Sequence, residues 1–134
     1  MHPDAYRFIA ETIGEPSSVL EVGSLDINGS PRGLVLNCNW YGIDLQDGPA
    51  VDEIADAATW RSPRRFDLAI CAEVLEHTPA VPEVLATIAH HLDRGGRLIV
   101  TCATHGRAPH SAIDGGQVRP HEHYANVDPI MFLH

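Results

Sequence analysis

Apolar runs of strand length alternate along the chain with helical or polar segments. Five runs are predicted as strands, at residues 18–23, 40–44, 51–57, 66–72 and 97–102. The first run is apolar enough to be a parallel strand that is covered on both faces. No internal repeat divides the pattern, so it predicts a single domain over residues 1–134.

Two segments have the spacing of amphipathic helices. The first begins at Pro3 and ends before Gly14,. Its apolar side is formed by Ala5, Phe8, Ile9 and Ile13. The second ends at the turn 93–96, and its apolar face is formed by Val81, Leu85, Ile88 and Leu92,. A short helical segment is also predicted after Ser30 and Pro31, and another element around residues 130–133,.

Strands that alternate with helices predict the α/β class. We expect a Rossmann-like, mostly parallel sheet with right-handed crossovers and helices on both faces. The connection between the second and third strands is too short to hold a helix, so that crossover is abbreviated. The core covers residues 18–102, and residues 103–134 form a long tail that we expect to be a lid, a substrate-binding loop or an oligomer contact,.

An acidic residue stands at or near the end of each of the first two strands. Glu21 and Gly23 end the first strand, and Asp44 ends the second. In an open parallel sheet this arrangement is typical of a nucleoside-like ligand, whose ribose hydroxyls meet the second carboxylate. A dinucleotide site also needs glycines at positions 25 and 28, where this chain has Leu25 and Asn28,. The pattern therefore disfavours an NAD-dependent dehydrogenase.

Charge and composition narrow the function classes further. The chain has 9 basic and 18 acidic side chains, a formal net charge of −9 with neutral histidines, so nucleic acid is an unfavourable partner,. No run is long enough to cross a membrane, and the N-terminus lacks the regions of a signal peptide,. We therefore expect a cytoplasmic protein without a membrane partner, in which Cys71 and Cys102 are reduced core residues.

Five motifs in this order resemble those of class I S-adenosylmethionine-dependent methyltransferases. They are Val19–Gly23, Gly42–Asp44, Ala55–Ala57, Phe66–His77 and Leu92–Val100. The resemblance covers roughly residues 18–102 and implies S-adenosylmethionine as the cofactor. The loop 24–29 departs from the family's glycine-rich pattern, and the chain stops before the family's last two strands. The fifth strand would then be an open edge, covered by the tail or by a second copy in a homo-oligomer.

The resemblance implies a set of cofactor-binding residues: Glu21, Gly23, Ser24, Asp44, Leu45, Asp56, Ala57, Ala72 and Glu73. Glu21 would meet the ammonium of the methionine portion, and Asp44 would accept hydrogen bonds from both ribose hydroxyls. Leu45 would lie against the adenine face, while Asp56 and the Ala57 amide would recognise its edge. Ala72 and Glu73 would border the sulfonium.

Methyl transfer depends mainly on positioning of the acceptor, sometimes with a base that removes its proton. His77, just after the fourth strand, is the first candidate base, and His105, after the fifth strand, is the second,. A structural role for His77 as a cap of a helical turn is the alternative.

A metal site is a further alternative. Glu73, Glu76 and His77 have helical spacing and could face one Mg²⁺ or Mn²⁺ ion together with a tail histidine,. Similar stretches occur in metal-dependent methyltransferases that act on RNA or on quinol precursors. The tail histidines His105, His110, His121 and His123 have no recognised zinc-ligand spacing,. Arg119, His123 and Tyr124 of the tail are predicted to contact the acceptor.

The sequence thus predicts a methyltransferase that uses S-adenosylmethionine and a polar small-molecule or glycan-like acceptor. The alternative is an S-adenosylmethionine-binding domain without independent catalysis, which another subunit would complete.

Overall fold

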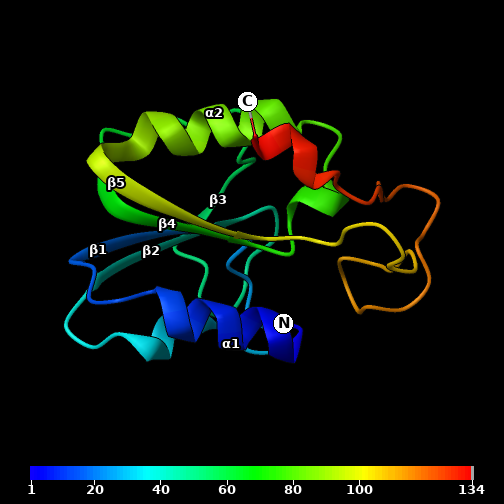
Figure 1. Ribbon diagram of the computed structural model, residues 1–134, viewed down its shortest axis with the longest axis horizontal. Coiled ribbons are helices and arrows are strands. Elements are labelled where there is room, and N and C mark those ends of the chain that lie inside the picture. The colour runs from blue at the N-terminus through cyan, green and yellow to red at the C-terminus, as the bar shows by residue number, and fades with distance from the viewer. Residues whose placement is uncertain (134) are drawn as a thin grey trace.

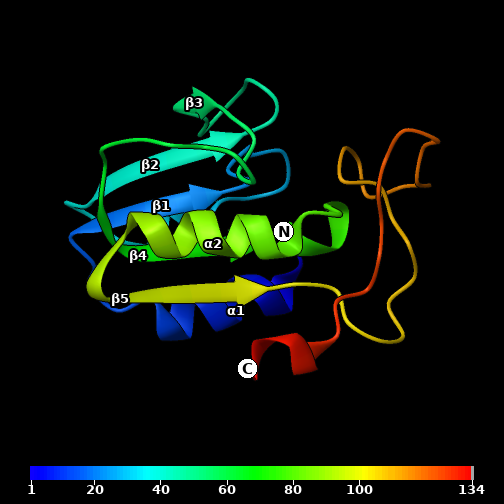
Figure 2. The same ribbon diagram turned by 90° about the horizontal axis from the view of Figure 1, so that it is seen from above.

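Five parallel strands form one sheet in the order β3-β2-β1-β4-β5. The strands are β1 (Ser18–Val22), β2 (Asn39–Asp44), β3 (Glu53–Ile54), β4 (Phe66–Ala72) and β5 (Leu92–Thr101). The computed structural model describes residues 1–133, so the last residue of the predicted tail lies outside the described part. Figure 2 shows the strands side by side, with β2 on one side of the central strand β1 and β4 on the other. The predicted Rossmann-like α/β fold is confirmed.

Helix α1 (Pro3–Thr12) covers one face of the sheet and α2 (Val81–His91) covers the other (Figure 1). A proline in the first turn suits the start of each helix because its missing N–H has no partner there anyway,. The guanidinium of Arg97 donates hydrogen bonds to the carbonyls of Thr12 (3.0 Å) and Ile13 (2.7 Å). These contacts satisfy carbonyls that the end of α1 leaves open.

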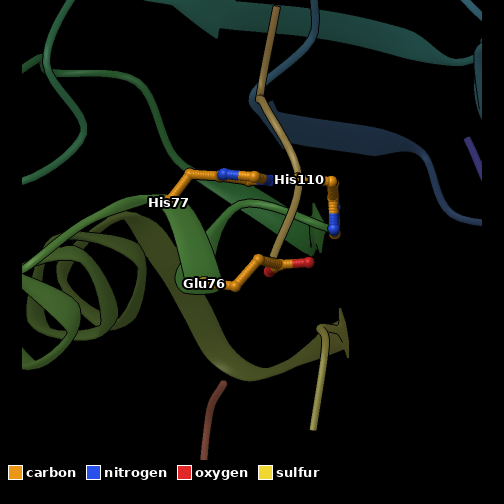
Figure 3. Close-up of side chains that lie close together, drawn as sticks. All are labelled: Glu76, His77 and His110. Atoms are coloured by element: carbon orange, nitrogen blue, oxygen red, sulfur yellow. The ribbon is translucent and has the colours of Figure 1, made fainter. Parts of the chain in front are cut away.

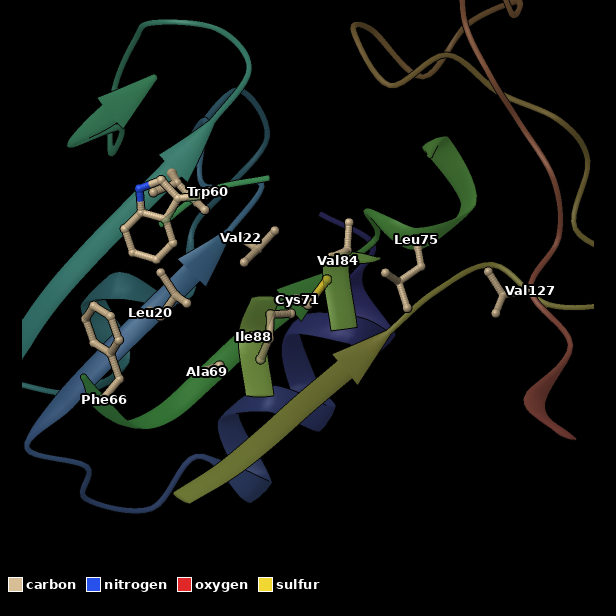
Figure 4. Packing of buried hydrophobic residues seen from close by; sticks show 11 residues of the cluster. Leu20, Val22, Trp60, Phe66, Ala69, Cys71, Leu75, Val84, Ile88 and Val127 are labelled. Atoms are coloured by element: carbon tan, nitrogen blue, oxygen red, sulfur yellow. The ribbon is translucent and has the colours of Figure 1, made fainter. Parts of the chain in front are cut away.

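Side chains alternate across the strands, which divides the core into two layers. On the α1 side, the buried residues are Ile9, Ile13, Val19, Leu68, Ile70 and Ile99. The layer on the α2 side includes Leu20, Val22, Phe66, Ala69, Val84 and Ile88, and Figure 4 shows their packing around β1, β4 and α2. By this alternation Glu21 projects to the same face as Val19, toward the α1 layer, where its side chain is buried,.

The predicted third strand, the end of the second helix and the start of the fifth strand differ from the structure. The third strand is limited to Glu53–Ile54, because the amides of Thr59 and Trp60 fold back onto the carbonyl of Asp56 and form a turn. Helix α2 ends at His91, one residue before the predicted Leu92, which already pairs with Phe66 of β4. The register between β4 and β5 then shifts over residues 93–96, and the regular ladder begins at Arg97.

Within residues 1–133, three 3-10 turns complete the secondary structure: η1 (Pro31–Leu34), η2 (Leu75–His77) and η3 (Pro129–Phe132). Two of them, η1 and η3, fall where short elements were predicted. No helix within residues 1–133 is long and apolar enough to cross a membrane.

The tail runs beyond the carboxyl ends of the strands and does not return to the sheet as a strand (Figures 1 and 2). It is anchored through backbone bonds from Ala125 to the carbonyl of Glu76 and from Val127 to the carbonyl of Ala103, both 2.8 Å long. Within the described residues, β5 pairs only with β4. The tail therefore adds no strand beside β5, and cover of this edge by the tail or by a second copy stays a prediction.

Candidate functional site

The carboxyl ends of β1, β2 and β4 open into two adjoining pockets. Seven of the residues predicted to bind a cofactor line the first pocket: Gly23, Asp44, Leu45, Asp56, Ala57, Ala72 and Glu73. The other two, Glu21 and Ser24, line the second pocket, which shares Gly23, Ala72 and Glu73 with the first. The fold therefore brings all nine predicted residues to one continuous surface at the sheet edge where ligands of open α/β folds bind.

Asp44 connects the two loops that form the rim of the first pocket. Its Oδ2 accepts a hydrogen bond from the amide of Leu25, and its Oδ1 accepts one from the amide of Gln46, each 3.1 Å long. Each carboxylate oxygen retains a second lone pair for a further donor. Asp44 can thus hold the loops in place and still receive a vicinal diol from the pocket.

Gly23 turns the chain at the end of β1 with a φ of 73°, a conformation that favours glycine,. A Cβ at this position would collide with the side chain of Val74. Gly42 on β2 is equally restricted, since a Cβ there would collide with the carbonyl of Ala50 and the side chain of Ser24. The close packing at Gly42 depends on tertiary contacts, and its local sequence carries no signal for it.

Glu21 is a buried acid at the second pocket, with 4% of its surface exposed. Its Oε2 accepts a hydrogen bond of 2.7 Å from the indole Nε1 of Trp40. Burial raises the pKa of Glu21 from 4.5 to about 7, although the indole bond and the nearby Arg32 act in the opposite direction,. A cationic group in the second pocket would complement this carboxylate.

Apolar side chains border the first pocket in an exposed position. Ile27 and Leu45 are 54% and 70% exposed, and Ile113 reaches the same pocket from the tail. An exposed apolar surface beside a pocket indicates a ligand with an apolar face. The tail thus contributes to the pocket wall through Ala112 and Ile113.

Glu73 adopts an unusual backbone conformation between the two pockets. Its φ is 57°, its amide donates to the carbonyl of Thr101 (2.7 Å), and its Oε2 accepts from the amide of His2 (2.9 Å). Left-handed conformations of residues other than glycine are costly and occur preferentially at functional sites. This turn directs the chain out of β4 into η2.

Glu76, His77 and His110 converge beside the second pocket, as Figure 3 shows. One ligand atom from each residue lies within 4.8 Å of the other two. This group differs from the predicted set of Glu73, Glu76 and His77, which assumed a helical turn. The turn η2 begins only at Leu75, after the left-handed Glu73, so Glu73 lies outside the group and the tail residue His110 belongs to it.

The three side chains are partly withdrawn from solvent. Glu76 Oε1 accepts a hydrogen bond of 3.0 Å from the amide of Ala103, and burial raises the pKa of Glu76. Burial, followed by the proximity of His110, lowers the pKa of His77 and favours its neutral form,. The ring of Tyr124 packs at 5.5 Å from His77 and 5.0 Å from His110.

The remaining predicted residues lie farther from the first two pockets. The side chain of His105 is 78% exposed and lines a third pocket, which also includes Thr101, Glu76 and His110. Arg119 forms an ion pair of 2.9 Å with Asp114 and, like the exposed His123, lines none of the three pockets. Their predicted contact with an acceptor has no support in this arrangement.

A family described as a methyltransferase domain matches residues 3–129. The chain belongs to this methyltransferase family. Its fold is that of class I S-adenosylmethionine-dependent methyltransferases, and membership implies S-adenosylmethionine as the cofactor. No curated protein matches the chain.

Two crystal structures of the N-methyltransferase NodS from Bradyrhizobium japonicum WM9 are similar to this methyltransferase domain. The first, in complex with S-adenosyl-L-homocysteine, has a TM-score of 0.58 and 18% identity, and the match covers 72% of this chain and 58% of that one. For the second, the TM-score is 0.57, the identity 18%, and the coverage 75% and 66%. The methyltransferase domain thus spans less than two thirds of the length of either structure, and the likeness shows the fold alone.

The residues present fit the cofactor that the family implies. Gly23 lacks the Cβ that would obstruct the turn at β1, and the buried hydroxyl of Ser24 has no hydrogen-bond partner among residues 1–133. Asp44 supplies two acceptor oxygens, and the buried Glu21 supplies an acid for an ammonium group.

Proposed function

We propose that this domain binds S-adenosylmethionine across the first and second pockets and transfers its methyl group to a polar small-molecule acceptor in the third. The observation that carries the proposal is the convergence of all nine predicted residues on the first two pockets. The three pockets share Glu73, so a group in the third lies next to the second.

The first pocket would hold the adenosine portion. Asp44 would accept hydrogen bonds from the ribose hydroxyls through the lone pairs that its backbone donors leave open,. Asp56 and Ala57 line the pocket where the adenine edge would lie, and the exposed side chains of Ile27 and Leu45 would cover its faces.

The second pocket would hold the methionine portion. Glu21 would pair with the ammonium group, and the hydroxyl of Ser24 would bond the carboxylate,. Ala72 and Glu73 line both pockets and would therefore border the sulfonium, which connects the two portions. The cofactor supplies an already activated methyl group, so this chain's residues act chiefly by orienting the acceptor and excluding water.

His77 is the proposed base for the acceptor's proton, because its ring lies 5.1 Å from that of His110, which lines the third pocket, and its pKa is lowered. A neutral imidazole can accept a proton at neutral pH. His105 lines the third pocket and is the second candidate base. Its side chain is exposed, so water could accept the proton in its place.

Calorimetry with S-adenosylhomocysteine tests the binding. Asp44→Ala should weaken binding at least about tenfold, since it removes a charged acceptor worth about 1.5–3 kcal/mol. Asp47→Ala is the matched control, an exposed acid three residues away that lines none of the three pockets. Absence of binding by the intact chain, or equal effects of the two substitutions, would contradict the proposal.

The acceptor class is tested by release of S-adenosylhomocysteine over a panel of amines, hydroxyl compounds and glycans. An acidic surface, with a net charge of −9, suits neutral or cationic acceptors better than polyanions,. The similar NodS structures are of an N-methyltransferase, so amines belong in the panel. Turnover with RNA but with none of the small molecules would contradict the proposed acceptor class.

A second candidate function is cofactor binding without independent catalysis. In this function another subunit would complete the domain, which spans 58% and 66% of the similar NodS structures. Binding of S-adenosylhomocysteine without turnover over the whole panel would support this function over the first.

A further inference from the structure

Two buried polar atoms at the third pocket have no hydrogen-bond partner within residues 1–133. They are Oε2 of Glu76, a side chain that is 1% exposed, and Oγ1 of Thr101, the last residue of β5. Both residues line the third pocket. Buried polar atoms in folded proteins nearly always have a partner, because each one left without it costs the free energy of its lost hydration. The two atoms therefore indicate a polar group of a ligand in this pocket.

Two hydrogen bonds hold the end of β5 against the segment that follows β4. The amide of Glu73 donates to the carbonyl of Thr101 (2.7 Å), and the amide of Ala103 donates to Oε1 of Glu76 (3.0 Å). The bond from Ala103 fixes the carboxylate of Glu76 through one oxygen and leaves the other oxygen without a donor. A ligand would thus meet an acceptor that is already in place, which lowers the entropic cost of binding.

The charges around the third pocket favour a cation. With neutral histidines, its charged groups are the carboxylates of Asp4, Glu73 and Glu76 and the guanidinium of Arg107. Burial raises the pKa of Glu76, because the buried carboxylate has lost its hydration, and a bound cation would compensate this charge,. An ammonium group also has several N–H donors and no acceptor, which matches a carboxylate oxygen and a hydroxyl that both lack a donor.

Apolar side chains line the same pocket. They are Ala5 and Phe8 of α1 and Val100 of β5, and Phe8 is 48% exposed. Apolar walls beside a few polar groups are typical of sites for small molecules, in which the polar groups fix the orientation of the ligand. The third pocket therefore suits an amine that also has a hydrocarbon portion.

We propose that the methyl acceptor is an amine with an apolar portion, and that Glu76 and Thr101 bind it in the third pocket as its ammonium. This inference rests on the proposed function and names its substrate class. Oε2 of Glu76 would pair with the ammonium, and the hydroxyl of Thr101 would accept a second N–H. A ring nitrogen of His110 lies within 4.8 Å of the Glu76 carboxylate (Figure 3), so this ring would turn aside to admit the ligand,.

His77 keeps its role as the base in this arrangement. One of its ring nitrogens lies within 4.8 Å of a carboxylate oxygen of Glu76, so it is close to the bound ammonium. The ammonium gives one proton to this ring, which frees the lone pair on nitrogen. That lone pair forms the bond to the methyl carbon, whose bond to sulfur breaks with the electron pair left on sulfur. The methylated ammonium product is again a cation paired with Glu76, and the proton on His77 passes to water.

The test is calorimetric titration of the chain, without any cofactor, with amines and alcohols of the same carbon skeleton. The pairs are phenethylamine with phenethyl alcohol, benzylamine with benzyl alcohol, and cyclohexylamine with cyclohexanol. We expect at least one amine to bind about tenfold more tightly than its alcohol, because only the amine forms a charged pair with Glu76. The amide resonance of Ala103, which donates to Glu76, should shift with this amine and not with its alcohol.

Glu76→Gln removes the charge but keeps an oxygen for the amide of Ala103. It should weaken binding of the amine at least about tenfold and change that of the alcohol less than about twofold. Asp4→Asn is the matched control, since it removes a carboxylate from the same pocket. Asp4 is exposed and already paired with Arg7 at 3.0 Å, so its loss should change amine binding less than about twofold,.

Thr101→Val provides a second variant, which keeps the shape of the side chain and removes its hydroxyl. It should weaken amine binding about fivefold. It should not lower the midpoint of thermal unfolding of the free chain, because the atom that it removes has no partner there. A purely structural role of Thr101 would instead lower the midpoint and leave amine binding unchanged.

The proposal is overturned if no amine of the panel binds more tightly than its alcohol, or if Glu76→Gln and Asp4→Asn have equal effects. These titrations need no cofactor, so they and the binding of S-adenosylhomocysteine can each fail alone. With S-adenosylmethionine and an amine substrate, Glu76→Gln should raise KM at least about tenfold with a smaller fall in kcat. Methylation of hydroxyl compounds but of no amine would overturn the substrate class.

Discussion

Glu21 on β1 accepts a hydrogen bond of 2.7 Å from the indole nitrogen of Trp40 on β2, inside the face of the sheet that α1 covers. The bond satisfies one oxygen of an acid that is 4% exposed. It does not balance the cost of burying the charge, so the pKa of Glu21 lies at about 7,. A group at the expected methionine end of the site therefore changes its charge near neutral pH.

The first prediction concerns stability. Between pH 4.5 and about 7 the folded chain holds a proton on Glu21 that the unfolded chain has lost,. The contribution of Glu21 to the free energy of unfolding therefore falls as the pH rises through this window, by about 3 kcal/mol at most. Glu21→Gln should remove this slope and make the chain more stable than the native one above pH 7. Urea unfolding at pH 5 and pH 8 measures both effects.

Glu83→Gln, on the exposed side of α2, is the control for this experiment. It should leave the pH dependence of the free energy of unfolding as it is in the native chain. Equal slopes in Glu21→Gln and the native chain would show that burial does not hold the proton on Glu21.

The second prediction concerns cofactor binding. If the ammonium of S-adenosylhomocysteine pairs with the Glu21 carboxylate, binding below pH 7 must release a proton from that group,. The affinity should then be about tenfold lower at pH 6 than at pH 8, since each pH unit below the pKa costs about a factor of ten. Calorimetry in buffers of different ionisation enthalpy measures the released proton directly. Glu21→Gln should abolish the proton release and weaken binding at pH 8.

A pH-independent affinity in the native chain would place the ammonium elsewhere. If Glu21→Gln still releases a proton on binding, the proton comes from another group.

The strand ends could be predicted from the sequence because they follow from local rules. The residues that end β1, β2 and β4 are adjacent to apolar runs, and parallel strands bring such ends to one edge of the sheet. Gly23, Asp44 and Glu73 therefore meet in the structure where the motifs suggested. The conformation of Glu73 was not predictable, since a positive φ at a glutamate results from the surrounding packing,.

The convergence of Glu76, His77 and His110 was predictable only in part. Helical spacing suggested that Glu76 and His77 act together, but it also included Glu73, which the 3-10 turn excludes. His110 belongs to a tail without hydrophobic periodicity, so its place beside His77 depends on tertiary contacts such as the bond from Ala125 to Glu76. Likewise, β3 is short because a turn at Asp56 competes with the strand.

The third prediction concerns the turn at Gly23. Gly23→Ala places a Cβ against Val74 in a backbone with a φ of 73°, so it should destabilise the fold by about 1–3 kcal/mol and weaken cofactor binding,. Val74→Ala in the same chain should restore part of the loss, because it removes the collision but not the backbone strain. Chemical unfolding of the single and double variants measures the two contributions.

Gly29→Ala is the matched control, since Gly29 also has a positive φ, of 106°, but a Cβ there would meet no atom within 4 Å. The fall in the free energy of unfolding of Gly29→Ala should therefore reflect the backbone strain alone. A loss at Gly29 as large as that at Gly23, or no recovery with Val74→Ala, would contradict the role of the close contact.

The fourth prediction concerns the tail as part of the cofactor pocket. Glu122 accepts hydrogen bonds from the hydroxyl of Ser111 (2.8 Å), the amide of Ala112 (3.1 Å) and the amide of Arg119 (2.8 Å). These bonds, first that of the Arg119 amide, hold the pKa of Glu122 below its usual value. They also fix the segment that brings Ile113 to the first pocket.

Glu122→Ala should therefore release this segment while leaving the sheet intact. We expect the affinity for S-adenosylhomocysteine to fall about fivefold, with little change in the free energy of unfolding. Hydrogen exchange should also become faster at the amides of Ala112 and Arg119, which lose their acceptor,. Gln117→Ala, an exposed substitution in the same loop, should change neither property. If Glu122→Ala speeds this exchange but leaves the affinity unchanged, the tail is anchored as described but does not cover the bound cofactor.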